Sequence, residues 1–307
     1  MGTPEAQPPV VAIFGPTGIG KTSIAIGLAE LLRQDGEDPV AVSVDSMQVY
    51  SELPLLTGAA TAREQSQLEH RLVGTTSVTE SWDVATHADL AHAAIDELRG
   101  AGRRPIVVGG TGLYLRAALT ELDLLPPAQP EVRARLENDL AMWGQAGLYG
   151  RLVATDPEVA GSIDPADSRR TLRALEAHEQ GRSASDREVN RLWTDDVRVP
   201  TRLFALTMKR DLLYERIEQR VESMVAAGAE DEVEAAEELG ASRTARQALG
   251  YRELLSGDVE AMKVNTRRYA KRQLTWLRKL AGADLLDVTN RTADEVAADI
   301  AGRLRTG

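Results

Sequence analysis

The segment Gly15-Pro16-Thr17-Gly18-Ile19-Gly20-Lys21-Thr22 matches the phosphate-loop pattern G-x-x-x-x-G-K-[ST] in full. It follows an apolar, β-branched run at 10–14 and precedes a stretch at 22–33 whose apolar residues recur at helical spacing. Loop N–H groups and the helix N-terminus can hold a pyrophosphate, Lys21 adds a positive charge, and the Thr22 hydroxyl can bind Mg²⁺. A glycine-rich structural turn is the alternative, and the flanking strand and helix disfavour it. The pattern leaves open whether the ligand is a nucleotide or another pyrophosphate ester.

Further apolar runs predict the rest of a sheet. Val40–Val44, Ile106–Val108 and Leu203–Met208 have the length and composition of buried strands, and helical stretches such as Val84–Leu98 separate them. This alternation predicts an α/β fold of the P-loop NTPase type, with a parallel sheet flanked by helices. Ligands of such sheets bind at the carboxyl ends of the strands, where Gly15, Asp45 and Thr111 are expected.

The chain changes character between residues 123 and 200. Helical patterns occur at Pro130–Trp143, Gly147–Ala154 and Ser168–Glu179, with no strand pattern between them. We therefore expect a helical insertion domain at 123–200, within an α/β core formed by 1–122 and 201–307. Leu212–Ala227 and Thr266–Leu280 predict a helical C-terminal region.

Composition excludes some classes of protein. The chain of 307 residues has no cysteine, which excludes a disulfide framework, a thiolate zinc site and a cysteine nucleophile. The formal net charge of −11 argues against attraction of the whole surface to nucleic acid. However, the segment Arg243–Lys279 carries ten cations and three acids, a net charge of +7. It is either a nucleic-acid contact or a solvated basic face that balances an acidic neighbour such as Glu230–Glu238.

No feature of the sequence predicts a membrane or secreted protein. Met1–Val10 is polar and proline-rich, without the basic start and apolar stretch of a secretory signal. No apolar run is long enough to span a bilayer. We interpret the protein as cytoplasmic, with no membrane partner.

Polar residues follow the second predicted strand in the segment Asp45-Ser46-Met47-Gln48-Val49-Tyr50. The Asp45 carboxylate could coordinate magnesium or act as a general base. Gln48 could form hydrogen bonds with the edge of an adenine. A helix cap is the structural alternative for Asp45.

A second glycine-rich turn, Gly109-Gly110-Thr111-Gly112, follows another predicted strand. Its glycines let the backbone approach a ligand closely, and the Thr111 hydroxyl can reach that ligand. A tight structural turn would have the same local pattern.

These three motifs together resemble the tRNA dimethylallyltransferase family, also called tRNA isopentenyltransferases. The resemblance runs through nearly the whole chain. It includes the further segments Asp167-Ser168-Arg169-Arg170-Thr171-Leu172-Arg173, Tyr214-Glu215-Arg216-Ile217-Glu218-Gln219-Arg220, Ala248-Leu249-Gly250-Tyr251-Arg252-Glu253 and Thr266-Arg267-Arg268-Tyr269-Ala270-Lys271-Arg272-Gln273-Leu274-Thr275-Trp276-Leu277-Arg278.

The resemblance implies a reaction and its partners. Members transfer a dimethylallyl group from dimethylallyl pyrophosphate to N6 of an adenosine beside the anticodon of tRNA, and release pyrophosphate. Asp45 resembles the general base, Thr111 the hydroxyl that contacts the scissile oxygen, and Arg220 the arginine that binds pyrophosphate with Lys21 and the loop Gly15–Thr22. Thr22 would hold Mg²⁺. The family precedent also suggests a monomer.

The same resemblance implies a set of residues that bind the anticodon stem-loop. These are Asp45, Ser46, Met47, Gln48, Thr111, Arg169, Arg170, Arg173, Arg246, Gln247, Gly250, Tyr251, Lys271, Arg272 and Arg278. For the arginines and lysines among them, helical surface charges in intrahelical pairs are the structural alternative.

The sequence departs from the family pattern at three places. Gly18-Ile19 replaces the usual Ala-Ser, the segment Leu56-Thr57-Gly58-Ala59-Ala60 lacks the usual lysine, and Gly74 replaces an aspartate. These differences bear on RNA affinity and substrate identity more than on the pyrophosphate site. Three other functions remain open from sequence: prenylation of free AMP, a small-molecule P-loop kinase, and a non-catalytic RNA-binding module.

Overall fold

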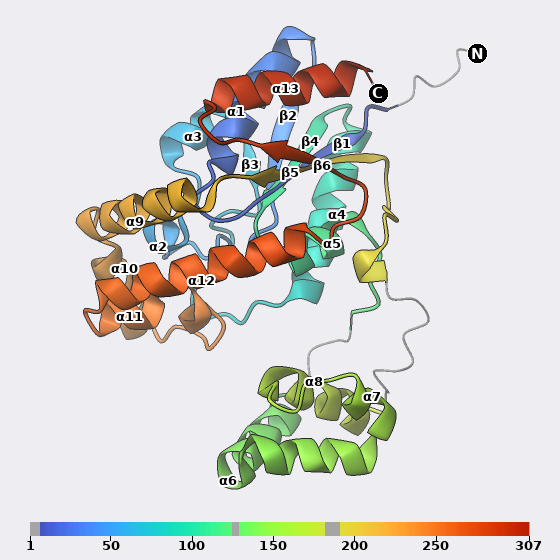
Figure 1. Ribbon diagram of the computed structural model, residues 1–307, viewed down its shortest axis with the longest axis vertical. Helices are drawn as coiled ribbons and strands as arrows, with labels where there is room; N and C mark the ends of the chain where they lie inside the picture. Colours follow the sequence, from blue (N-terminus) through green and yellow to red (C-terminus); the bar gives the residue numbers. More distant parts are fainter. Residues whose placement is uncertain (1–6, 125–128, 182–190, 307) are drawn as a thin grey trace. The chain divides into compact units, whose positions relative to one another are not determined.

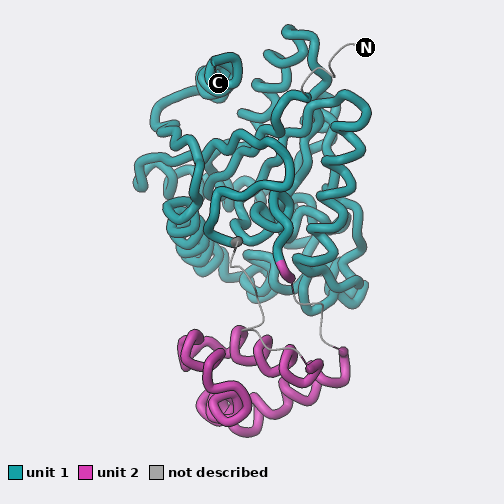
Figure 2. The backbone as a smooth tube through the Cα atoms, turned by 90° about the vertical axis from the view of Figure 1, so that its right-hand side faces the viewer, with its two compact units in different colours: residues 1–122, 191–307 teal, residues 123–190 magenta. Residues whose placement is uncertain are grey.

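The computed structural model describes residues 7–124, 129–181 and 191–306. These residues form two compact units, one made of 1–122 with 191–307 and one made of 123–190 (Figure 2). Residues 191–200, which the sequence analysis placed in the insertion, belong to the first unit. Two contacts explain this: the N–H of Arg198 donates to the carbonyl of Leu119 at 2.8 Å, and Trp193 packs on Trp276 with ring centroids 4.5 Å apart.

The first unit is built on a six-stranded sheet of order β3-β2-β4-β1-β5-β6, in which all neighbours pair in parallel (Figure 1). The predicted α/β fold with a parallel sheet is confirmed. The strands are β1 Val10–Phe14, β2 Pro39–Ser43, β3 His70–Arg71, β4 Arg104–Gly109, β5 Thr201–Thr207 and β6 Ala283–Asp287.

Both faces of the sheet are covered by helices because the strands are apolar on both sides. In β1, Val11 and Ile13 face one core cluster, and Val10, Ala12 and Phe14 face the other. Helices α1 Lys21–Gln34, α9 Arg210–Ala226 and α13 Ala293–Thr306 contribute to the first cluster, and α4 Val84–Gly100 and α5 Gly112–Leu119 to the second.

The remaining helices of this unit are α2 Pro54–Thr57, α3 Ala62–Gln67, α10 Ala229–Glu238, α11 Tyr251–Leu255 and α12 Val259–Leu277, with short 3-10 turns at Arg191–Trp193 and Ala245–Gln247. Helix α12 supplies several residues of the candidate site. Helix α12 begins at Asp258, whose side chain accepts a hydrogen bond from the N–H of Ala261.

The second unit is helical in its described part, with α6 Pro130–Thr155, α7 Pro157–Gly161 and α8 Ser168–Glu179. The two helices predicted at 130–143 and 147–154 are both present within α6, separated by a kink at Gly144, whose φ of 67° and ψ of 178° are not helical. A positive φ suits glycine, so this residue explains the break in the helical pattern. Leu136, Leu148, Leu152 and Leu175 lie in the core of this unit.

Candidate functional site

The phosphate loop joins β1 to α1 at the carboxyl edge of the sheet. Gly18 and Gly20 have φ values of 81° and 96°, a conformation that side chains other than glycine rarely adopt. Lys21 folds back over the loop, and its Nζ donates hydrogen bonds to the carbonyls of Gly15 at 3.0 Å and Pro16 at 3.1 Å. The ammonium group is therefore held beside the loop.

Three charged side chains influence one another at this site. Burial lowers the pKa of Lys21 to about 8; the charge of Asp45 opposes this change and that of Arg220 adds to it. Burial also lowers the pKa of Arg220, against the opposing effect of Asp45. The structure thus brings together Lys21, Asp45 and Arg220, which lie far apart in the sequence.

Asp45 lies two residues after the end of β2, at the edge of the sheet. Its Oδ1 accepts a hydrogen bond from the N–H of Met47 at 2.9 Å, which closes a local turn. Asp45, Ser46 and Met47 are all half-buried. Because this turn leaves the second carboxylate oxygen available, it is compatible with the roles of general base and magnesium ligand.

The Gln48 side chain is already engaged at both ends. Its Oε1 accepts from the Ser43 hydroxyl at 3.0 Å, and its Nε2 donates to the Gly58 carbonyl at 3.1 Å. The amide therefore ties β2 to the segment after α2. Contact of Gln48 with an adenine would require an exchange of these bonds.

Arg220 reaches the site from α9. Its Nη2 donates to the carbonyl of Thr57 at 3.5 Å. A Cβ atom on Gly58 would lie 1.7 Å from this Nη2, so the glycine leaves the space that the guanidinium occupies.

Thr111 begins α5 and meets a side chain that the sequence analysis did not assign to the site. Its hydroxyl lies 3.2 Å from the hydroxyl of Tyr269 on α12. Burial, together with the charge of Asp45, raises the pKa of Tyr269 to about 12, so this phenol keeps its proton at neutral pH. The Arg272 guanidinium lies 5.4 Å from the Tyr269 ring centroid.

Gln273, also on α12, contacts both glycine-rich segments. Its Oε1 accepts from the N–H of Thr17 at 2.9 Å, and its Nε2 donates to the carbonyl of Gly110 at 2.9 Å. In the sequence, Tyr269 and Gln273 belong to the segment at 266–278 that resembles the family, and their spacing of four residues places them on the same side of a helix.

The donors near the phosphate loop suit Mg²⁺. Thr22 lies in the first turn of α1 and is half-buried, and Asp45 supplies a carboxylate. No group of three or more His, Cys, Asp or Glu side chains able to hold a metal occurs among the described residues. Mg²⁺ commonly takes one or two protein oxygens and completes its shell with water and substrate phosphate, and this donor set fits that pattern.

The departure at Ile19 is explained by packing. Ile19 is 2% exposed and lies in the core cluster with Leu206 and Ile217. An apolar side chain therefore suits this position of the loop.

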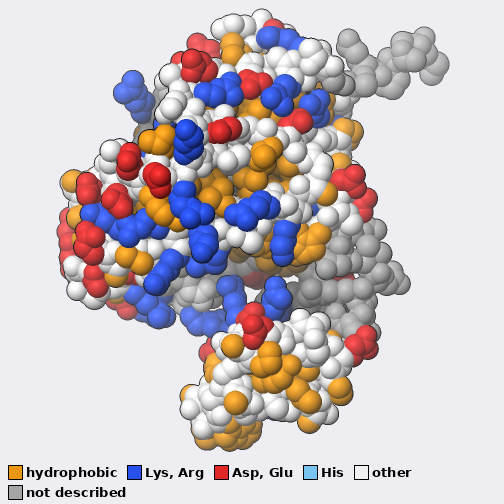
Figure 3. All heavy atoms as spheres, in the orientation of Figure 1, with side chains coloured by type: hydrophobic (Ala, Val, Ile, Leu, Met, Phe, Trp, Pro, Cys, Tyr) orange, Lys and Arg blue, Asp and Glu red, His pale blue; other side chains and the backbone are white. Residues whose placement is uncertain are grey.

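Exposed cations lie along α12. Figure 3 shows Lys and Arg side chains gathered over the face of the first unit that carries this helix. Lys271, Arg272 and Arg278 are exposed and form no ion pair with any described residue. By contrast, Lys263 and Arg267 are paired with the acids Glu222 and Glu218.

Arg246 and Tyr251 share one acidic partner. Arg246 donates to both carboxylate oxygens of Glu237 at 2.9 and 2.8 Å, and the Tyr251 hydroxyl donates to Glu237 at 2.9 Å. The Tyr251 side chain is completely buried. It therefore holds the Arg246–Glu237 pair in place and does not itself face solvent.

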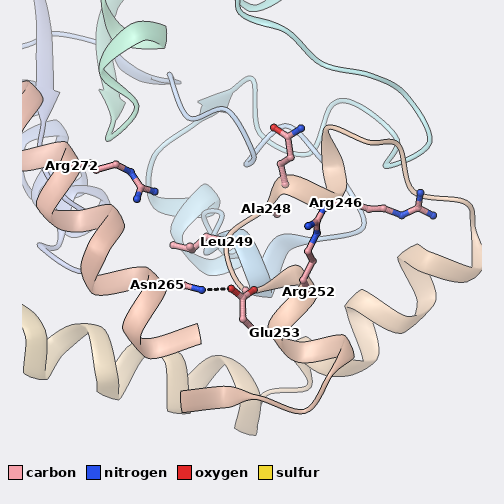
Figure 4. A pocket seen from close by; sticks show the side chains of 9 residues that line it. Arg246, Ala248, Leu249, Arg252, Glu253, Asn265 and Arg272 are labelled. Carbon is pink, nitrogen blue, oxygen red and sulfur yellow. Dashed lines mark hydrogen bonds between the residues drawn. The ribbon is translucent and has the colours of Figure 1, made fainter. Parts of the chain in front are cut away.

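A cavity of about 340 Å³ lies between α12 and the segment around α11 (Figure 4). Within it, Asn265 donates to Glu253 at 2.6 Å. Its lining includes four of the predicted RNA-binding residues, and consists of Arg246, Gln247, Ala248, Leu249, Gly250, Arg252, Glu253, Asn265 and Arg272.

The predicted arginines of the second unit lie on α8. Arg169 and Arg170 are exposed, and Arg170 lies 3.6 Å from Asp167. Arg173 is paired with the buried Glu176 at 3.1 Å, so it also stabilises the core of this unit.

Within the described part of the chain, no helix has both the length and the apolar character needed to cross a membrane.

The chain is similar to enzymes of one kind. The family model described as IPP transferase matches residues 48–280. The tRNA dimethylallyltransferase of Thermobifida fusca is 40% identical over 282 residues, which cover 88% of this chain and 87% of that protein. That of Streptomyces avermitilis is 40% identical over 291 residues, with 91% and 90% covered.

The solved structures to which this chain is similar are described as enzymes of the same kind. The tRNA isopentenylpyrophosphate transferase of Bacillus halodurans has a TM-score of 0.68 and 34% identity, and 97% of each chain is covered. A eukaryotic dimethylallyltransferase acting on tRNA has a TM-score of 0.73 and 26% identity, with 92% of this chain and 74% of that one covered.

Proposed function

Because this chain belongs to the tRNA dimethylallyltransferase family, we propose that it transfers a dimethylallyl group from dimethylallyl pyrophosphate to N6 of the adenosine next to the anticodon of tRNA, releasing pyrophosphate. The observation that carries the proposal at the level of residues is the position of the Lys21 ammonium on the phosphate-loop carbonyls, with Asp45 and Arg220 close enough for their charges to act on it. One carboxylate beside two cations suits a reaction that both removes a proton and stabilises a leaving pyrophosphate.

The first task of the site is to stabilise the leaving group. As the bond between the prenyl C1 and oxygen breaks, negative charge grows on the pyrophosphate. Lys21 and Arg220, both held by hydrogen bonds to backbone carbonyls, supply positive charge there. The loop Gly15–Thr22 adds N–H groups and the N-terminus of α1. The Thr111 hydroxyl is proposed to contact the scissile oxygen.

We propose that Mg²⁺ binds at Thr22, together with pyrophosphate oxygens and water. When bound, this ion would neutralise part of the charge of the pyrophosphate. The half-buried position of Thr22 in the first turn of α1 supports this assignment.

The second task is to activate the adenine amine, which is a weak nucleophile because its lone pair is delocalised into the ring. Asp45 is proposed to take the proton from N6 as N6 attacks C1. Its turn with Met47 holds the carboxylate at the strand end, and holding N6 close to C1 reduces the entropy cost of the reaction.

The third task is to grip the RNA. Extrusion of a base from its stack costs a few kcal/mol, which contacts with the surrounding nucleotides must offset. We propose that Arg246, Gln247 and Gly250 at the 340 Å³ cavity, Lys271 and Arg272 on α12, and Arg278 directly after it bind the anticodon stem-loop. Arg169, Arg170 and Arg173 of the second unit are proposed to bind it as well. Since one chain carries all these residues, a monomer acting in the cytoplasm is the proposed form.

The test offers radiolabelled dimethylallyl pyrophosphate and magnesium in parallel to unmodified bulk tRNA and to AMP. We expect label in tRNA alone. Label in AMP alone would assign the protein to prenylation of a free nucleotide. Label in neither, with phosphoryl transfer from ATP instead, would refute the proposed reaction.

A further inference from the structure

Helix α12 has one face that contacts all the glycine-rich segments of the site. Tyr269, Gln273 and Trp276 are spaced by four and three residues, so they lie on the same side of the helix. Tyr269 meets the Thr111 hydroxyl, and Trp276 packs so closely on Gly112 that a Cβ there would lie 2.2 Å from its ring. Gln273 lies between these two contacts.

Gln273 joins two loops that are distant in sequence. It accepts from the N–H of Thr17 in the phosphate loop and donates to the carbonyl of Gly110 at the end of β4, each at 2.9 Å. The side chain is 4% exposed. A buried amide with both ends bonded fixes the separation of the groups that it joins.

The contact between Gln273 and Gly110 lies beside the charged side chain of Lys21. A Cβ atom on Gly110 would meet the Gln273 Nε2 at 2.4 Å, the Gly15 carbonyl at 3.0 Å and the Lys21 Nζ at 3.4 Å. Gly110 and Gln273 therefore border the atoms that hold Lys21. Any shift of Gln273 would move the phosphate loop relative to Thr111.

We infer that Gln273 is a positioning residue, which sets the phosphate loop against the Gly110 turn so that Lys21 and Thr111 act on the same pyrophosphate. This inference rests on the proposed function, because it assigns Thr111 and Lys21 to one substrate. Gln273 itself is not proposed to contact any reacting atom and acts through Lys21 and Thr111. Its effect is expected on the pyrophosphate substrate and not on tRNA.

The test compares Gln273→Glu and Gln273→Met with a matched control, Thr266→Val. Glutamate keeps the shape but loses the donor to Gly110, and methionine keeps the bulk but loses both bonds. Thr266 is a buried residue of the same helix, and among the described residues its hydroxyl bonds only the Met262 carbonyl, at 2.7 Å. Its replacement therefore perturbs α12 without touching either loop.

The measurements are the KM values for dimethylallyl pyrophosphate and for tRNA, the affinity for inorganic pyrophosphate by calorimetry, and the melting temperature. For both Gln273 variants we expect the KM for the prenyl donor to rise and the pyrophosphate affinity to fall, by about tenfold or more, with the KM for tRNA unchanged within about twofold. Thr266→Val should leave all three constants near wild type.

A purely structural role for Gln273 would lower the melting temperature while leaving the donor KM and pyrophosphate affinity unchanged, and that result would overturn the inference. So would equal effects of Thr266→Val. If Gln273→Glu does not fold, Gln273→Met carries the test. If the wild-type protein transfers no label to tRNA, the proposed function fails, and pyrophosphate affinity still decides the role of Gln273.

Discussion

The proposed pyrophosphate site and the basic face of α12 are built in opposite ways. At the first, Lys21 is fixed by hydrogen bonds to carbonyls of its own loop, and Arg220 and Gln273 by hydrogen bonds to backbone groups from distant parts of the chain. At the second, Lys271 and Arg278 are exposed and form no ion pair with described residues. The first region is therefore organised before its ligand arrives, whereas the second offers charge without fixed geometry. Changes in the first should alter chemistry, and changes in the second should alter salt-dependent affinity.

The largest effect is expected at Asp45. Asp45→Asn keeps an oxygen for the bond from Met47 but removes the base, so kcat should fall by about 10²–10⁴-fold with little change in either KM. Single-turnover kinetics on unmodified tRNA would measure this. Turnover at the wild-type rate would exclude Asp45 as the general base.

The next effect is expected at Arg220. Arg220→Gln removes a cation from the leaving group, so kcat/KM for the prenyl donor should fall by about 10²-fold. Gly58→Ala should produce a defect of the same kind, because its Cβ would displace the guanidinium. Steady-state kinetics with varied donor would test both. If Gly58→Ala has the wild-type kcat/KM for the prenyl donor, Arg220 does not need its observed position for activity.

Much of this fold was predictable from sequence, and the reasons are physical. The strand at 10–14 and the helix at 168–179 matched their observed bounds, because each combines a clear apolar pattern with a clear boundary signal: the phosphate loop ends β1, and Asp167 starts α8. The edge strands β3 and β6 were not predicted. β3 has only two residues, and β6 is partly exposed and contains two aspartates, so neither resembles a buried strand.

A smaller effect, dependent on pH, is expected at Lys21. Burial lowers the pKa of Lys21 to about 8 in the free protein, and a bound pyrophosphate favours the protonated amine. As the pH rises through about 8 the free protein loses this proton, so the KM for the prenyl donor should rise, by at most about tenfold per pH unit.

The pH profile of donor KM between neutral pH and pH 9.5, a range of about 2.5 units, would measure this rise. In Lys21→Arg the guanidinium stays protonated throughout, so the rise should be absent there. An equal rise in both proteins would assign the titration to another group.

The smallest effects are expected on the basic face. Lys271→Ala and Arg278→Ala should each raise the KM for tRNA several-fold and make the salt dependence of binding shallower, without changing the donor KM. Filter binding at several salt concentrations would measure this. A change in kcat at saturating tRNA would show that the face also positions the base.

The candidate site was only partly predictable. The glycine-rich loop and Asp45 stand out because their local patterns mark strand ends. Gln273 and Tyr269 could not be assigned from sequence, because their partners Thr17 and Thr111 lie more than a hundred residues away and no local pattern predicts those contacts. The burial of Tyr251 and its hydrogen bond to Glu237 were likewise not predictable from the local sequence, and its role in binding tRNA stays a prediction.

We propose that the phosphate loop holds the pyrophosphate of a prenyl donor while the dimethylallyl group of that donor is transferred to tRNA. The most direct measurement counts pyrophosphate released and prenylated adenosine formed in one reaction that contains tRNA, magnesium and the donor but no nucleoside triphosphate. We predict one pyrophosphate for each modified adenosine. Dependence of the transfer on ATP, or release of orthophosphate in its place, would contradict the account.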